Sequence, residues 1–191
     1  DGGRIGCAIL GAVTDVTLTA SGFVPYYTYS GSLAVGGTVG PVTTSCTTQT
    51  FYYSLTDVDT ACSGGAGSAA HSCGIHIHSG SSCTEAAGGP SYTGAVTVDP
   101  WTSIAYTSEV DGTASGSVVV DTGASSSSLI GLVMIVHGYE GDRIGCAILQ
   151  AETEVTLTAS GFVPYYTYSG SLAVGGTVDP MRTSGTVQTF H

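Results

Sequence analysis

The sequence predicts an all-β fold. Charged residues make up only 9% of its 191 residues, and Gly, Ser, Thr and Val dominate. Most apolar stretches are short and β-branched, and glycine-containing turn sequences separate them. Helix signals are absent. We therefore expect eight short strands that close in Greek-key order into a flattened barrel or sandwich around one substantial core.

The strands can be placed in order along the chain. We expect them near residues 28–39, 47–57, 74–79, 95–98, 103–108, 116–121, 130–137 and 143–149. Turns are predicted at Gly36-Gly37, Gly64-Gly65, Asp111-Gly112 and Gly123. The apolar run over residues 129–136 is shorter than the roughly 18 residues of a membrane span, so it predicts a buried strand.

The chain contains an internal repeat. Residues 16–39 are identical to residues 155–178, and residues 140–149 nearly copy residues 1–10. The offset is constant, since 146 minus 7 and 155 minus 16 both give 139. The likeness continues to Phe51 and Phe190, so the sequence predicts one repeat and about a third of the next.

Two histidines in the strand near residues 74–79 have the spacing of a metal site. His76 and His78 are two apart, so in a strand both imidazoles project from one face while Ile75 and Ile77 face the core. Imidazole pairs suit copper or zinc. Two histidines on a solvated strand face are the alternative, but His137, at the end of the apolar run, is a third candidate ligand.

Four motifs together resemble a known family. They are Gly74-Ile-His-Ile-His-Ser-Gly80, Cys83 with Gly88-Gly89, Val136-His137, and Asp142-Arg143-Ile-Gly-Cys146-Ala-Ile-Leu149. In this order and spacing they are similar to the copper-zinc and copper-only superoxide dismutases, and most of all to the secreted, repeated copper-only domains. The resemblance covers about residues 27–149. It implies a superoxide dismutase-like module in a tandem repeat.

The resemblance also implies roles for individual residues. His76, His78 and His137 match copper ligands, Arg143 matches the active-site arginine that attracts and orients superoxide, and Cys83 and Cys146 match the family disulfide. The fourth imidazole of the family is missing, because Pro90 or Ser91 stands where it is expected. The remaining zinc ligands are also missing, so copper is the expected cofactor and zinc is not.

Arg143 and His71 each allow a second interpretation. Arg143 could instead pair with Asp142 or Glu140 at the surface. His71 could be a replacement ligand, but a solvated loop histidine is the reading we favour. Cys62 and Cys73 flank a Gly/Ala/Ser loop and could form a disulfide.

Two further cysteines have no assigned partner. Cys7 occupies the Cys146 position of a preceding module, so its natural partner lies outside this chain. A pair between Cys7 and Cys46 is a guess.

Composition restricts the partners and the compartment. The net charge is −11 and the only three cationic side chains are arginines, so nucleic-acid binding is excluded. Six cysteines in a Gly/Ser-rich chain fit an oxidising compartment. We expect an extracellular, secreted protein.

The family frame assigns the segments of the chain. Residues 1–15 would be the closing strand of a preceding repeat, 16–26 an inter-repeat linker, 27–149 the complete module, 150–164 a second linker, and 165–191 the opening strands of a following repeat. The alternative for the first linker is an ordinary first strand with a proline at its edge.

Two functions are compatible with this organisation. The first is a copper-binding module that disproportionates superoxide. The second is a structural subunit that uses a catalytically lapsed fold, in which neighbouring copies join head to tail into an array or filament.

Overall fold

The computed structural model describes residues 16–152, 155–160, 169–171, 177–184 and 187–189. The chain divides into two compact units at the boundary between Ala151 and Glu152. Each unit is described by itself below.

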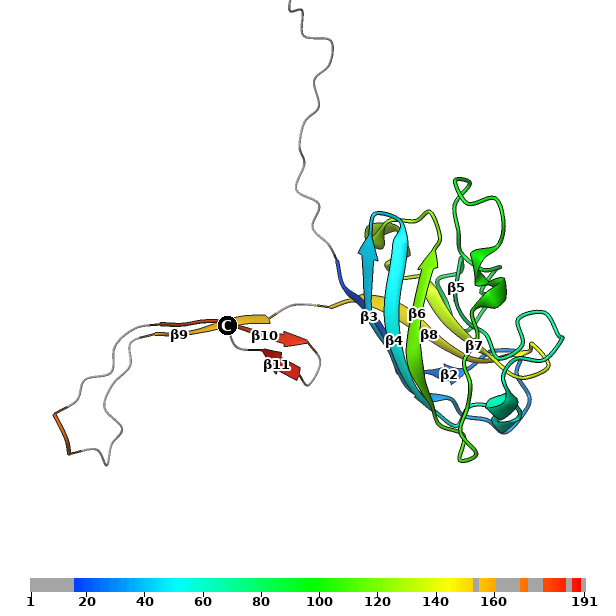
Figure 1. Cartoon of the computed structure of the whole chain (residues 1–191), viewed down its shortest axis with the longest axis horizontal. Coiled ribbons are helices and arrows are strands. Elements are labelled where there is room, and N and C mark those ends of the chain that lie inside the picture. Colours follow the sequence, from blue (N-terminus) through cyan, green and yellow to red (C-terminus); the bar gives the residue numbers. More distant parts are fainter. Residues whose placement is uncertain (1–15, 153–154, 161–168, 172–176, 185–186, 190–191) are drawn as a thin grey trace, which may run out of the picture. The chain divides into compact units, whose positions relative to one another are not determined.

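The first unit is an eight-stranded antiparallel sheet curled into a half-barrel (Figure 1). Its strands are β1 (Leu18–Ser21), β2 (Val24–Pro25), β3 (Gly36–Ser45), β4 (Thr48–Thr56), β5 (Ile75–His78), β6 (Ala114–Asp121), β7 (Val133–His137) and β8 (Arg143–Ala151). The order across the sheet is β5-β7-β8-β1-β3-β4-β6, with β2 paired to β8. The all-β prediction is confirmed, while Greek-key closure stays a prediction.

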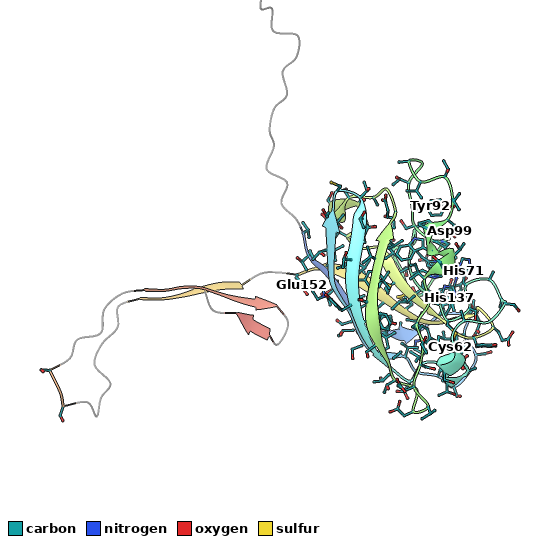
Figure 2. The ribbon with its side chains drawn as sticks, viewed as in Figure 1. Cys62, His71, Tyr92, Asp99, His137 and Glu152 are labelled. Atoms are coloured by element: carbon teal, nitrogen blue, oxygen red, sulfur yellow. A yellow bond between two sulfur atoms is a disulfide. The ribbon has the colours of Figure 1, made fainter. Side chains whose placement is uncertain are left out.

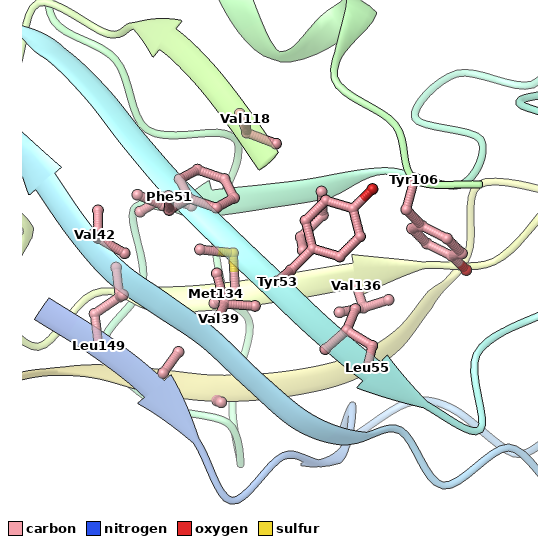
Figure 3. Close-up of a cluster of buried hydrophobic side chains, with 14 of the residues drawn as sticks. Val39, Val42, Phe51, Tyr53, Leu55, Tyr106, Val118, Met134, Val136 and Leu149 are labelled. Carbon is pink, nitrogen blue, oxygen red and sulfur yellow. The ribbon is translucent and has the colours of Figure 1, made fainter. Parts of the chain in front are cut away.

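The core lies inside the curl of the sheet. On β4, Phe51, Tyr53 and Leu55 alternate with exposed residues and turn inward, as period-2 patterning requires. They join Met134 and Val136 of β7 in one cluster (Figure 3). This cluster anchors β5 and β7, because Ile75 and Ile77 belong to it as well.

Two predicted strands are wrong. Residues 95–98 form no strand, and the segment predicted at 103–108 contributes only an isolated bridge between Gly74 and Ala105. A 3-10 helix, η2 (Pro100–Ser103), lies here because the Asp99 side chain caps it by accepting from the Trp101 N–H at 2.9 Å. Trp101 is fully buried and its indole N–H donates to Ser91. The chain here therefore buries Trp101 in a short helical turn and does not pair as a strand.

The strand predicted at 28–39 begins later. Only from Gly36 does the chain enter β3, because a tight turn, in which the Tyr29 N–H donates to the Tyr26 carbonyl at 2.7 Å, takes the preceding residues out of the sheet. Among the residues that the structure describes, short helical turns besides η2 are η1 (Thr60–Gly64) and α1 (Ser126–Leu129).

The segment expected to link repeats contributes β1 and β2 to the sheet. β1 lies between β8 and β3, and β2 pairs Val24 with Cys146. Residues 18–21 therefore form an ordinary strand, as the alternative interpretation of the first linker predicted. That the segment 16–26 also joins two repeats stays a prediction.

The second unit contains a three-stranded sheet of β9 (Val155–Ser160), β10 (Thr177–Ser184) and β11 (Val187–Thr189). Its pairing repeats that of β1, β3 and β4 at the offset of 139 residues. Leu157 pairs with Met181 as Leu18 pairs with Val42, and Arg182 pairs with Thr189 as Thr43 pairs with Thr50. The irregularity between Val178 and Met181 also matches the one between Val39 and Val42 in the pairing of β1 with β3. Near-identical sequences thus give the same strand register.

Candidate metal centre

β5 places two imidazoles on the face opposite the core. Ile75 and Ile77 belong to the main cluster, so the alternation of the strand turns His76 and His78 the other way. Neither ring is solvated, because His76 is 0% and His78 is 1% exposed. The reading of two histidines on a solvated face is therefore wrong.

β7 brings the third imidazole to the same face. His76 is paired with Ile135, and paired residues of antiparallel strands point to the same side of the sheet. His137 is two residues beyond Ile135 and therefore shares that side. The result is a buried group in which one nitrogen from each of His76, His78 and His137 lies within 4.8 Å of the others.

Each ring is oriented by a backbone carbonyl. The carbonyl of Ile104 lies 2.9 Å from His76 Nε2, that of Gly88 lies 3.1 Å from His78 Nδ1, and that of Gly141 lies 2.9 Å from His137 Nδ1. A carbonyl oxygen only accepts, so each of these ring nitrogens carries the hydrogen. In a neutral imidazole the opposite nitrogen then carries a lone pair.

The three lone pairs converge. Nε2 of His78 and Nε2 of His137 face each other at 3.3 Å, and Nδ1 of His76 is buried without a hydrogen-bond partner among the described residues. Two nitrogen ligands about 2 Å from one ion stand roughly 3 to 3.5 Å apart. The 3.3 Å spacing of His78 and His137 therefore fits two ligands of one metal ion, and His76 offers a third nitrogen within 4.8 Å of both.

Burial keeps the three rings neutral. It lowers the pKa of His76 to about 4 and the pKa values of His78 and His137 to about 3, against the partial opposition of the carbonyl hydrogen bonds. The charge of Arg143 lowers the pKa values of His78 and His137 further. Neutral imidazole is the form that binds metal, so the ligands need no deprotonation near pH 7.

Arg143 is held beside this group. One terminal nitrogen donates to the Tyr26 hydroxyl at 2.8 Å and the other to the Gly88 carbonyl at 2.6 Å, with the guanidinium 5.3 Å from the centre of the Tyr26 ring. The sequence had left open that Arg143 pairs with Asp142 or Glu140. In the structure these two nitrogens instead bind Tyr26 and Gly88. The Gly88 carbonyl thus contacts both His78 and Arg143.

Two disulfides fix the loops around the group. Cys83 bonds to Cys146, which ties the loop that carries Gly88 to β8, and Cys62 bonds to Cys73, immediately before β5. Cys46 is an exposed free cysteine. A pair between Cys46 and Cys7 cannot be judged, because Cys7 lies outside the described residues.

The fourth imidazole was expected at Pro90 or Ser91. In the structure these two residues pair with the backbone of β5. His78 and Pro90 form an isolated bridge, and the Ser91 N–H donates to Ile77 at 2.7 Å. This pairing closes the loop over β5.

His71 is not the solvated loop histidine that we favoured. Its ring centre lies 5.2 Å from that of His76 and 5.5 Å from that of His137, and its Nδ1 is buried (Figure 2). The cause is a sharp turn, with left-handed backbone at both His71 and Cys73, that folds the residue back over β5. Sequence patterns do not predict that reversal.

Two contributors to the site were missed from the sequence. Tyr26 was assigned to a linker, although its hydroxyl receives hydrogen bonds from Arg143 and from the Ala87 N–H. Gly88 was quoted only as part of a motif. Its positive φ of 69° signals a special backbone role, but only the fold reveals which groups its carbonyl contacts.

Comparison with known proteins does not assign the chain to a family. No protein-family model matches it, and neither does any curated protein. Two disulfides fit an extracellular protein. Among the described residues, no helix has the length and apolar character needed to cross a membrane.

Proposed function

We propose that this chain is a secreted, superoxide dismutase-like module that binds copper through His76, His78 and His137 and disproportionates superoxide. The observation that carries the proposal is the convergence of three imidazole lone pairs, each fixed by a carbonyl on the opposite ring nitrogen. Imidazole sites bind copper(II) more tightly than the other common divalent metals of the first transition row. The motif resemblance favours copper too.

Bound copper would supply one-electron chemistry, taking an electron from one superoxide and giving it to a second, which leaves as peroxide after protonation. The residues of the chain do the rest. The three histidines hold the ion, and Arg143 attracts and orients the anion with its guanidinium. Arg143 is in position for this role because Tyr26 and Gly88 fix both terminal nitrogens.

Metal content tests the first half of the proposal. Purified protein is loaded with copper, and its stoichiometry is measured by elemental analysis together with electron spin resonance. We expect about one copper per chain, lost in His76→Ala and in His137→Ala, because each substitution removes a ligand. His191→Ala removes an imidazole that the proposal does not use and should keep the copper. Copper that survives both ligand substitutions contradicts the site.

Turnover tests the second half. The rate of superoxide loss is followed in a stopped-flow instrument for wild type and for Arg143→Gln. The variant should retain its copper, because all three histidine ligands remain, and lose at least about tenfold in rate, because the charge that attracts the anion is missing. Stoichiometric copper without turnover in wild type contradicts the enzymatic proposal and leaves a copper-binding protein.

The second candidate function is head-to-tail assembly, and the register of the second unit favours it. β9, β10 and β11 pair as β1, β3 and β4 do, and in the first unit β1 also pairs with β8. Residues 4–10 copy the start of β8 in sequence. If they pair with β9 of another chain in the β8–β1 register, Leu10 faces Ala159 and Ala12 faces Leu157.

A deletion of residues 1–12 tests this assembly. Light scattering over a range of concentrations should show oligomers for the full chain and monomers for the deletion, because the pairing segment is removed. A cysteine pair at Gly11 and Thr158, which are opposed in the same register, should crosslink between chains. A full chain that stays monomeric at all concentrations contradicts the assembly.

A further inference from the structure

His71 stands against the three-histidine group without belonging to it. The ring is half-buried, and its Nδ1 is one of three buried side-chain polar atoms in the described part of the chain that have no hydrogen-bond partner. Another of the three is Nδ1 of His76, the nitrogen that keeps its lone pair because Nε2 donates to the Ile104 carbonyl. A buried nitrogen left unsatisfied costs on the order of 1 to 3 kcal/mol, so its retention needs an explanation.

The spacing of the rings allows His71 to share an ion with His76 and His137. A ring centre lies about 3 Å from an ion bound by one of its nitrogens, so two rings on one ion have centres no more than roughly 6 to 6.5 Å apart. The three ligand rings are 5.0, 5.5 and 6.2 Å from one another. His71, at 5.2 Å from His76 and 5.5 Å from His137, falls within the same range.

The loop that carries His71 is held firmly. The φ of His71 is 62°, a left-handed conformation that is uncommon outside glycine but that histidine adopts more often than most residues. The Gly74 N–H stabilises it by donating to the His71 carbonyl at 2.9 Å. The Ser72 hydroxyl accepts from Gly67 and donates to Tyr139. The Cys62–Cys73 disulfide closes the loop two residues later. Only the side chain is left to move.

We propose that His71 is the fourth ligand of this metal centre and takes the place left by Pro90 and Ser91. The inference rests on the proposed function, because it presupposes an ion on His76, His78 and His137. His71 nitrogens lie outside the group that converges within 4.8 Å, so ligation requires its side chain to turn toward the ion. Four nitrogen donors suit the tetragonal preference of copper(II).

The decisive variant is His71→Asn. Asparagine adopts left-handed backbone far more readily than alanine, so the loop keeps its conformation, while its amide is a poor copper ligand. His191→Asn is the matched control, since it makes the same exchange at the last residue of the chain. Copper(II) is titrated into each protein, and the nitrogen superhyperfine pattern of the loaded protein is recorded by electron spin resonance.

We expect four coordinated nitrogens in wild type and in His191→Asn, and three in His71→Asn. The affinity for copper(II) should fall by at least about tenfold in His71→Asn only. Equal affinities and three nitrogens in all proteins would overturn the role of His71 and leave the proposed function intact. Loss of the proposed function looks different, because wild type itself would then bind no copper.

Discussion

One carbonyl oxygen, that of Gly88, links the metal group to the anion-attracting residue. It accepts from His78 Nδ1 and from the Arg143 guanidinium. The residue has a φ of 69°, and a Cβ atom there would lie 2.3 Å from the Ser79 hydroxyl oxygen. A side chain at this position would strain the backbone and displace the Ser79 hydroxyl, so glycine favours the observed place of this carbonyl.

Substitution at Gly88 should impair both functions together. We expect Gly88→Ala to lower copper affinity by about tenfold, because the His78 ring loses its orienting acceptor. It should also lower the free energy of unfolding by about 1 to 2 kcal/mol. Copper titration and urea denaturation measure the two effects. Gly89→Ala is the control, since a Cβ atom there meets nothing within 4 Å; equal losses in both variants would refute the role of Gly88.

The pKa values of the three buried histidines predict how the stability of the metal-free protein depends on pH. Burial lowers the pKa of His76 to about 4 and those of His78 and His137 to about 3, whereas an unfolded histidine titrates near 6.5. Between these pKa values the unfolded chain binds more protons than the folded chain. The stability that the three neutral histidines contribute is therefore present above about pH 6.5 and is lost as the pH falls toward 3.

Urea denaturation between pH 4 and 7 measures this dependence. We expect metal-free wild type to lose stability steadily on acidification over that interval. His137→Gln should show a flatter curve, because one titrating group is gone while the carboxylates remain. A variant curve as steep as that of wild type would contradict the pKa assigned to His137.

At the scale of elements, the two disulfides hold different loops of the site. The Cys83–Cys146 pair spans 63 residues and ties the Gly88 loop to β8, whereas the Cys62–Cys73 pair spans 11 residues and holds the turn before β5. In the chain-entropy model they stabilise the fold by about 4 and about 3 kcal/mol. Their energies are therefore similar although the loops they fix are not.

Serine substitutions should separate the duties. Cys62→Ser with Cys73→Ser is expected to resemble His71→Asn in its copper(II) spectrum, because the turn that presents His71 is released. Cys83→Ser with Cys146→Ser should instead slow the reaction with superoxide and weaken copper binding, because the Gly88 carbonyl no longer fixes Arg143 or orients His78. Calorimetry checks that both variants remain folded, and identical spectra and rates in the two would contradict this division.

The elements that the sequence predicted well are the short apolar strands. β5, β7 and β8 lie where their apolar residues indicated, and the residue spacing was enough to bring His76, His78 and His137 to one side. The clearest failures lie in the segment 95–108 and at His71. There, a buried Trp101 and a left-handed turn decide the path, and both depend on contacts distant in sequence.

At the scale of the whole molecule, charge opposes the proposed substrate. The chain carries a net charge of −11, so its field repels an anion, and attraction must come from Arg143 close to the site. Salt screens long-range repulsion more than it screens a contact of a few ångströms.

The rate with superoxide should therefore respond to ionic strength in a way that depends on Arg143. In Arg143→Gln only the repulsive field remains, so we expect added salt to raise the rate of this variant. Wild type should gain less, because screening also weakens its attraction to the anion. Stopped-flow measurements between about 10 and 300 mM salt span the relevant screening lengths. Parallel salt curves would show that Arg143 exerts no electrostatic attraction.

The matched register of β9–β11 and β1–β3–β4 bears on how a module is made. The three strands find the same partners in a unit without the strands β5 to β8. Their pairing information is therefore contained in the segment itself. During synthesis from the amino end, such a segment can assemble while the remainder is still on the ribosome. The metal ligands, which come later in the chain, would then be added to a frame that already exists.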